Sequence, residues 1–248
     1  MSEITKRPSS LRASRAAKIG GGAALLLAPV LSLFWHAPVQ AADRAVPPPE
    51  IDAPAAGDGV QTAVLSGGCF WGVQGVFSHV KGVKQVLAGY AGGKPATASY
   101  ELVSTGTTGH AESVQIKFDP AQISYGQILR IFFSVALDPT QLNRQSPDVG
   151  TQYRSEIFYT SPIQQNVAQS YIAQLDRAHA FNKPIATRVD PDQGFFPAEA
   201  YHQDYLTRHP DNPYIATYDL PKVEALKRLF PEYYVDSPVL AASKGSTS

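Results

Sequence analysis

The chain has 248 residues, of which 44% are hydrophobic and 17% charged, so it can form one domain of ordinary size with some additional sequence. Its 21 basic and 21 acidic residues give a net charge of zero, and no basic stripe favours nucleic acid. The single cysteine excludes a disulfide within the chain, and the only methionine is Met1.

The first 41 residues have the layout of a secretory signal peptide. A basic region precedes an apolar stretch from about Ile19 to Trp35, and Val39-Gln40-Ala41 is a small-x-small cleavage pattern. An uncleaved membrane anchor is the alternative, although the stretch is short for a span and contains Pro29. We expect residues 1–41 to be removed and the protein to be periplasmic or secreted, or membrane-anchored if they stay. Removal leaves a mildly acidic chain with no attraction to anionic membranes.

Two further segments flank the main domain. Residues 42–60 are rich in Pro, Ala and Asp, which is typical of a disordered linker. Residues 237–248 end in a small polar tail without periodicity, which we expect to be flexible. The intervening residues 61–236 contain no internal repeat and are compatible with a single domain.

Hydrophobic patterns within this domain predict an alternation of strands and helices. Strands are expected at residues 62–66, 83–90, 113–118, 152–159 and 185–190. Helices are expected at residues 69–80, 124–137 (with Ser124 as its N-cap), 161–179, 198–208 and 221–230. This order mixes hairpin and crossover connections, which predicts an α+β fold in which helices cover a mixed sheet in a two-layer sandwich.

Cys69 falls where the first strand gives way to the first helix. Gly67 and Gly68 turn the chain just before it, and the cysteine lies in the first helical turn. Unpaired N–H groups at a helix start favour a thiolate, so we expect a pKa below about 8.5. The glycines should let another molecule approach the sulfur. This context fits a reactive thiol as well as a buried structural cysteine.

Five short blocks occur in order along the domain. The first is Gly68-Cys69-Phe70-Trp71-Gly72, and the others are Tyr90–Gly93 with Ser99–Val103, Thr108–Glu112, Asp138–Asn143 with Asp148–Ser155, and Ala198–Gln203. Together they resemble the active-site signature and further blocks of the type A peptide methionine sulfoxide reductases. The resemblance covers nearly the whole domain, which it identifies as a catalytic domain over residues 61–236. It implies an α+β sandwich related to ferredoxin-like sheets.

Reduction of a sulfoxide requires a nucleophile at sulfur and a proton for the oxygen. The resemblance assigns the first role to Cys69. Glu112 is the candidate for the second, because partial burial at the start of a strand would keep it protonated near neutral pH. Tyr100 and Tyr153 would donate hydrogen bonds to the sulfoxide oxygen. Asp148 would order the loop or a water near the sulfur.

The substrate ends in a methyl group on sulfur, which suits aromatic faces. Phe70 and Trp71 lie beside the nucleophile and are candidates for that contact, with plain core packing as the alternative for each. His110 is a further candidate for substrate binding, as a hydrogen-bonding neighbour rather than an acid–base group, and His202 is expected to be structural. Gln74 replaces the Glu of many relatives, which removes a negative charge near the sulfur.

The resemblance also implies the reaction cycle. The S epimer of methionine sulfoxide, free or in oxidised proteins, is converted to methionine while Cys69 becomes a sulfenic acid. Many relatives then use a second cysteine near the C-terminus, which this chain lacks. An external thiol must therefore act, such as a thioredoxin-like protein, glutaredoxin with glutathione, or dithiothreitol. We expect a monomer without bound cofactor, metal or nucleotide.

Three other functions remain open at this point. A thiol acyl transferase could be built from Cys69, His110 and Glu112, although a two-residue spacing is awkward for a relay through the histidine. A thiol peroxidase would use the same cysteine on hydroperoxides. A non-catalytic domain would bind oxidised or Met-rich surfaces and tolerate Cys69→Ser.

Overall fold

The computed structural model describes residues 45–54 and 59–241. The signal peptide expected over residues 1–41 lies outside these ranges. Within them, no helix combines the length and the apolar character needed to cross a membrane.

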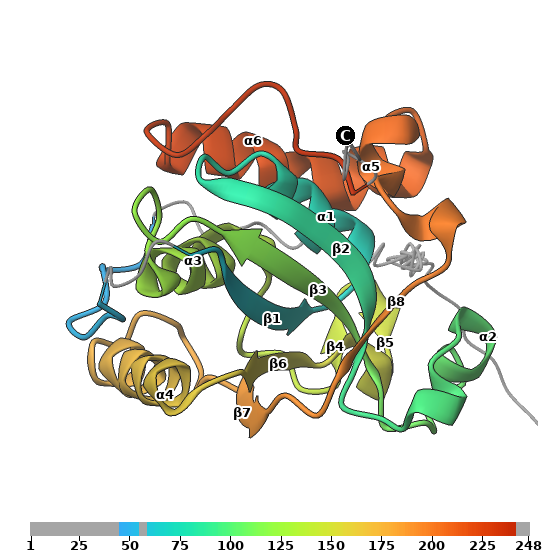
Figure 1. The fold of residues 1–248 in the computed structure, drawn as a ribbon, viewed down its shortest axis with the longest axis horizontal. Coiled ribbons are helices and arrows are strands. Elements are labelled where there is room, and N and C mark those ends of the chain that lie inside the picture. Colours follow the sequence, from blue (N-terminus) through green and yellow to red (C-terminus); the bar gives the residue numbers. More distant parts are fainter. Residues whose placement is uncertain (1–44, 55–58, 242–248) are drawn as a thin grey trace, which may run out of the picture. The chain divides into compact units, whose positions relative to one another are not determined.

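A six-stranded mixed sheet forms the centre of the domain (Figure 1), in the order β7-β6-β1-β3-β2-β8. Its strands are β1 Gln61–Gly67, β2 Val83–Ala91, β3 Ala111–Phe118, β6 Ser155–Tyr159, β7 Arg188–Pro191 and β8 Phe195–Pro197. All neighbouring pairs are antiparallel except the parallel pair β6–β7. A separate short ladder joins β4 and β5, which span Arg144–Gln145 and Asp148–Val149.

Helices fill the connections between the central strands. They are α1 Phe70–Ser78, α2 Tyr100–Val103, α3 Tyr125–Ile131, α4 Pro162–Arg177, α5 Tyr205–Arg208 and α6 Leu220–Leu229. Helix α1 links β1 to β2 across β3, and α3 lies between β3 and β6 in the chain, which gives the split βαβ arrangement of ferredoxin-like folds. The predicted α+β class is therefore confirmed.

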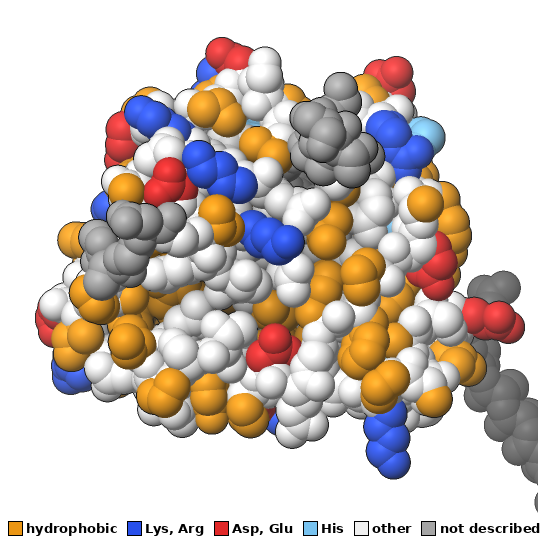
Figure 2. Space-filling view, viewed as in Figure 1, with side chains coloured by type: hydrophobic (Ala, Val, Ile, Leu, Met, Phe, Trp, Pro, Cys, Tyr) orange, Lys and Arg blue, Asp and Glu red, His pale blue; other side chains and the backbone are white. Residues whose placement is uncertain are grey.

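The side chains of β1 show which face of the sheet the helices cover. Ala63 and Leu65 belong to the main core with apolar residues of α1, α3, α4 and α6. Val64 points to the opposite face, where it packs with Ala91 and Phe158 in a small separate cluster. The helices therefore form one layer and the sheet the other. Hydrophobic, basic and acidic side chains are interspersed on the surface seen in this view (Figure 2).

Several element boundaries differ from those predicted. The α-helix expected over 124–137 ends at Ile131, and residues Phe132–Ala136 form a π-helical turn instead. The helix expected over 198–208 divides into a 3₁₀ turn and α5, because Asp204 has a φ of 55°. The strand expected from 152 starts only at Ser155, after a 3₁₀ turn. Helix α2 and strands β4, β5 and β8 were not expected.

The disordered linker predicted for residues 42–60 is wrong for the described residues 45–54. Val46 is buried, its N–H donates to Ser134 Oγ, and its carbonyl accepts from Arg130 of α3. The carboxylate of Asp52 accepts from Ser124 and from the Gly126 N–H at the start of α3. An extended Pro-rich segment has free carbonyls, and here donors on the helices satisfy them.

The expected flexible tail begins later than residue 237. The Val239 N–H donates to the carbonyl of Ser78, and the Ala241 N–H donates to the carboxylate of Asp204. Residues 237–241 therefore lie against the domain, and residues 242–248 are outside the described part of the chain.

Candidate active site

Cys69 occupies the N-cap position of α1, directly after the turn made by Gly67 and Gly68. Gly68 has a φ of 89°, and a Cβ there would lie 2.5 Å from the Cβ of Gln145. The cysteine is only 8% exposed. The expectation that the glycines open the sulfur to another molecule is therefore wrong for Gly68, whose missing side chain makes room for Gln145.

The acidity of Cys69 also differs from expectation. Burial, followed by the neighbouring carboxylates of Glu112 and Asp219, raises the pKa of the thiol well above its usual range. The Trp71 backbone N–H at the helix start lowers it by a smaller amount. The predicted low pKa is wrong because one helix-terminal hydrogen bond is outweighed in a dry and acidic site. The thiol is the resting form.

Glu112 reaches the start of α1 from β3. Its Oε2 accepts a hydrogen bond of 3.0 Å from the Phe70 N–H, the residue next to the cysteine. The side chain is 3% exposed, and burial raises the pKa of this carboxyl to about 8 despite that hydrogen bond. Glu112 is therefore a protonated acid at neutral pH beside Cys69, as its proposed role requires.

Tyr100 and Tyr153 approach the same region from two loops. Tyr100 starts α2, and its N–H donates to Glu199 Oε1, while Glu199 Oε2 accepts from the hydroxyl of Tyr90. Burial and the charge of Glu112 raise the pKa of both Tyr100 and Tyr153, and each also senses Cys69. Both hydroxyls therefore stay protonated as hydrogen-bond donors near the sulfur. Sequence reasoning missed Glu199, although it lies in one of the five blocks.

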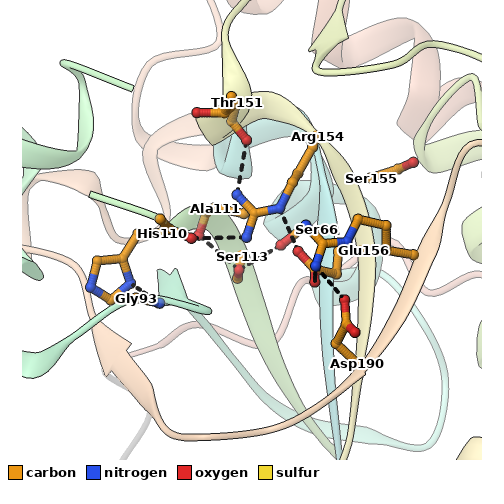
Figure 3. Close-up of polar contacts among 12 residues, drawn as sticks. Ser66, Gly93, His110, Ala111, Ser113, Thr151, Arg154, Ser155, Glu156 and Asp190 are labelled. Carbon is orange, nitrogen blue, oxygen red and sulfur yellow. Dashed lines mark hydrogen bonds and ion pairs between the residues drawn. The ribbon is translucent and has the colours of Figure 1, made fainter. Parts of the chain in front are cut away.

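A buried arginine holds the turn that carries Tyr153 (Figure 3). Arg154 donates from Nη1 to the Thr151 carbonyl, from Nη2 to the Gly109 carbonyl, and from Nε to Glu156 Oε2 at 2.5 Å. One guanidinium thus links the Tyr153 turn, the loop that leads into β3 and Glu112, and strand β6. Sequence reasoning missed it, and its place directly after Tyr153 was the available signal.

The aromatic residues beside the cysteine gather around His202. The indole N–H of Trp71 donates to His202 Nδ1 at 3.2 Å, and the indole stacks on Tyr205 with centroids 3.9 Å apart. The rings of Phe70 and Tyr100 lie 5.0 Å and 4.4 Å from the His202 ring. His202 therefore positions this cluster. Phe70 is 1% exposed and packs in the core, whereas Trp71 is only partly buried.

His110 contacts a different part of the chain. Its Nδ1 accepts from the Gly93 N–H at 3.2 Å, and Nε2 lies 3.0 Å from the Lys94 carbonyl (the first contact is drawn in Figure 3). Its ring packs against Tyr90 and Phe196. These contacts make it a support for the loop after β2, and none of them supports the predicted role in substrate binding. They also occupy both ring nitrogens, so no Cys–His relay forms.

Gln74 acts through hydrogen bonds that hold neighbouring segments together, rather than through the loss of a negative charge near the sulfur. Its amide group donates to the Val86 carbonyl and to Gln203 Oε1, and its Oε1 accepts from the Asp204 N–H. A glutamate could not make the two donor contacts. The amide ties α1 to β2 and to the segment after His202.

Asp148 is linked to the aromatic cluster through Tyr214, whose ring lies edge-on to Trp71 with centroids 6.1 Å apart. It accepts a hydrogen bond from the hydroxyl of Tyr214, and burial raises its pKa. Both residues line a pocket of about 20 Å³, together with Cys69, Val135, Leu137, Gln145, Ser146, Tyr218 and Lys222. The predicted site residues Cys69, Glu112, Tyr100, Tyr153, Trp71 and Asp148 are thus brought together, and His110 is not.

A cysteine at a helix start, faced by a protonated carboxyl and two tyrosine hydroxyls, defines a cysteine-dependent enzyme that adds a nucleophile and a proton to one polar bond. Comparison with known families agrees with this class. Residues 61–233 match the family model for peptide methionine sulfoxide reductase. The chain belongs to that family.

Individual relatives cover most of the same region. The chain is 56% identical over 188 residues to peptide methionine sulfoxide reductase MsrA 2 of Mesorhizobium japonicum, covering 76% of this chain and 96% of the relative. It is 50% identical to MsrA 2 of Synechocystis, covering 75% and 89%. Among solved structures, reduced Mxr1 of Saccharomyces cerevisiae gives a TM-score of 0.57 at 30% identity, covering 68% and 94%. Methionine sulfoxide reductase A of Corynebacterium diphtheriae gives 0.52 at 30%, covering 69% and 89%.

Proposed function

We propose that the protein reduces the S epimer of methionine sulfoxide, in oxidised proteins and as the free amino acid, to methionine. One observation carries the proposal. The Phe70 N–H binds Glu112, so a carboxyl with a pKa of about 8 stands next to the cysteine at the start of α1. A nucleophile and an available proton are what reduction of a sulfoxide requires.

The first step transfers oxygen to the enzyme. Cys69 Sγ bonds to the sulfoxide sulfur while Glu112 gives its proton to the sulfoxide oxygen. Tyr100 and Tyr153 donate hydrogen bonds to that oxygen as its negative charge grows. The bond between Cys69 Sγ and the substrate sulfur and the sulfur–oxygen bond of the substrate then break, the oxygen forms a bond to Cys69 Sγ, and the proton of the thiol replaces the one that Glu112 gave up. A thiol and a sulfoxide thus become a sulfenic acid and a thioether, with atoms and electrons balanced.

The aromatic cluster supports recognition of the methyl group. Trp71 is fixed by its hydrogen bond to His202 and by stacking on Tyr205, so its face is rigid. The rigid indole and the hydroxyls of Tyr100 and Tyr153 together fix where methyl and oxygen can lie. The mirror arrangement would place the oxygen against the indole, which supports selection of one epimer.

The oxidised enzyme depends on a thiol from outside. The chain contains one cysteine, so no second cysteine of the same chain can attack the sulfenic acid. A thioredoxin-like protein, glutaredoxin with glutathione, or dithiothreitol would form a mixed disulfide with Cys69 and then release it. Because no site residue has to come from a second copy, the protein is proposed to work as a monomer.

The proposed location is the periplasm or the exterior. Its support is the sequence pattern of residues 1–41, a basic region followed by an apolar stretch and a small-x-small site. N-terminal sequencing of the protein from its native host should begin near Ala42. A start at Met1 or Ser2 in the soluble cytosol would contradict export.

Epimer-resolved kinetics test the proposed activity. With racemic methionine sulfoxide and excess dithiothreitol, the S epimer should disappear completely while the R epimer remains, because one rigid site accepts one arrangement at sulfur. Chiral chromatography of the remaining sulfoxide measures this. Hydrogen peroxide should be consumed far more slowly. Equal loss of both epimers, or faster consumption of peroxide, would overturn the assignment.

A further inference from the structure

The pocket on the Asp148 side of Cys69 takes no part in the oxygen transfer described above. A volume of about 20 Å³ is room for roughly one water molecule, so the pocket is too small for a methionine side chain. It is closed by the C-terminal segment, from which Tyr214, Tyr218 and Lys222 enter the lining. Among the described residues that line it, only Lys222 is basic.

Lys222 is fixed in place by a buried carboxylate. Its Nζ lies 3.2 Å from Asp219 Oδ1, and the Asp219 side chain is 0% exposed while that of Lys222 is 20% exposed. Asp219 Oδ2 is buried and has no hydrogen-bond partner among the described residues. Both groups lie against the first turn of α1, since a Cβ on Gly72 would come within 2.1 Å of Asp219 Oδ1 and 3.0 Å of Lys222 Nζ. The glycine two residues after Phe70 therefore admits an ion pair beside the cysteine.

We propose that Lys222, positioned by Asp219, binds the oxygen of the Cys69 sulfenic acid in this pocket and protonates it when an external thiol attacks. The inference rests on the proposed function. Three observations support it. Lys222 and Cys69 line the same pocket, that pocket has room for about one water molecule, and the buried carboxylate of Asp219 holds the ammonium group of Lys222 in place.

The direction of attack at sulfur explains why the oxygen belongs there. A thiolate displaces a leaving group from sulfur along the line of the breaking bond, so the oxygen must lie opposite the incoming thiol. The thiol enters on the side that the product methionine has left. Rotation about the Cα–Cβ bond of Cys69 turns the oxygen towards the pocket, where Lys222 is the available donor because the hydroxyl of Tyr214 already donates to Asp148.

The step is balanced. A sulfur–sulfur bond forms between the external thiolate and Cys69, and the sulfur–oxygen bond of the sulfenic acid breaks. The Cys69 sulfur is reduced and the external sulfur is oxidised. The oxygen leaves as water after it receives a proton from Lys222 Nζ, and the partly exposed amine regains a proton from solvent.

Separate measurement of the two half-reactions tests the proposal. Enzyme is first treated with one equivalent of methionine-S-sulfoxide without reductant, and then mixed with dithiothreitol and quenched for intact mass. Lys222→Met should still yield equimolar methionine in the first turnover, whereas loss of the sulfenic acid should slow by about 10²-fold. Lys222→Arg should recover little of that rate, because a guanidinium keeps the positive charge at the same place but does not release a proton.

Two matched comparisons guard against misfolding. Lys227→Met removes another α6 lysine with an ion pair of 3.2 Å, to Asp236 on the surface, and should leave both half-reactions at the parent rate. Lys222→Met leaves a buried carboxylate unpaired, which can destabilise the fold. Asp219→Asn with Lys222→Met is therefore compared with Asp219→Asn alone, and resolution should be slower in the double variant.

The outcomes are distinguishable. Parent rates of resolution in Lys222→Met, or an equal slowing of both half-reactions, would overturn the assignment of Lys222. Absence of any sulfenic acid on parent Cys69 after the first turnover would overturn the proposed function, and the inference with it.

Discussion

Cys69→Ser should abolish sulfoxide reduction, with a fall in rate of at least about 10⁴-fold, as expected when a nucleophile is removed. A serine hydroxyl is a far weaker nucleophile than a thiol. Serine is a good N-cap residue of nearly the same size, so α1 should keep its start. Methionine release measured with excess dithiothreitol tests this.

The same variant separates the enzyme from a binding domain. The thermal midpoint of Cys69→Ser should remain close to that of the parent, which shows that the site is intact. A variant that folds normally and still reduces methionine sulfoxide would remove Cys69 from the mechanism. Loss of reduction in a variant that folds normally would exclude a domain that only binds oxidised surfaces, because such a domain would tolerate Cys69→Ser.

Glu112→Gln should lower the rate of sulfoxide reduction by about 10²-fold or more, because the variant loses the general acid. Glutamine keeps an oxygen that can accept the Phe70 N–H, so the start of α1 should be preserved. Cys69 should still react with an alkylating agent. Glu232→Gln makes the same chemical change at an exposed position and should have no effect. An undiminished rate in Glu112→Gln would move the proton source to the tyrosines.

The pH dependence of activity also tests the assignment of Glu112 as the general acid. Parent activity should fall as pH rises through about 8, where Glu112 loses its proton, and this limb should be absent in Glu112→Gln. The pKa of Glu112 is higher in the folded than in the unfolded chain, so its ionisation opposes folding. Stability linked to this group is complete below pH 4.5 and is lost as pH rises through about 8. Glu112→Gln should therefore unfold at a higher temperature than the parent at pH 9.

Local patterns predicted the fold well wherever a segment carried its own periodicity. Val73, Val76 and Phe77 at helical spacing predicted α1, and the caps Ser124 and Ser161 accept hydrogen bonds at the starts of α3 and α4. Strand β8 was missed because it has three residues and depends on pairing with β2. Tertiary contacts decide such short elements.

In the active site, too, features encoded locally were predicted and features that depend on distant segments were not. The block around Cys69 and the acid at Glu112 could be found from sequence, since motif and chemistry agree there. The pKa of Cys69 was predicted in the wrong direction, because burial and the carboxylate of Asp219 come from segments distant in the chain. Asp219 lies 150 residues after Cys69, and no local pattern marks it as a neighbour.

The central claim is that Cys69 takes the oxygen of methionine-S-sulfoxide and then waits for an external thiol. Stoichiometry without reductant tests it most directly: enzyme is mixed with excess racemic sulfoxide, and methionine, each epimer and the intact mass are measured. We predict methionine equimolar with enzyme, loss of the S epimer alone, and a dimedone adduct on Cys69 in a monomeric chain. Continued turnover without thiol, or a disulfide between two copies of the chain, would contradict the account.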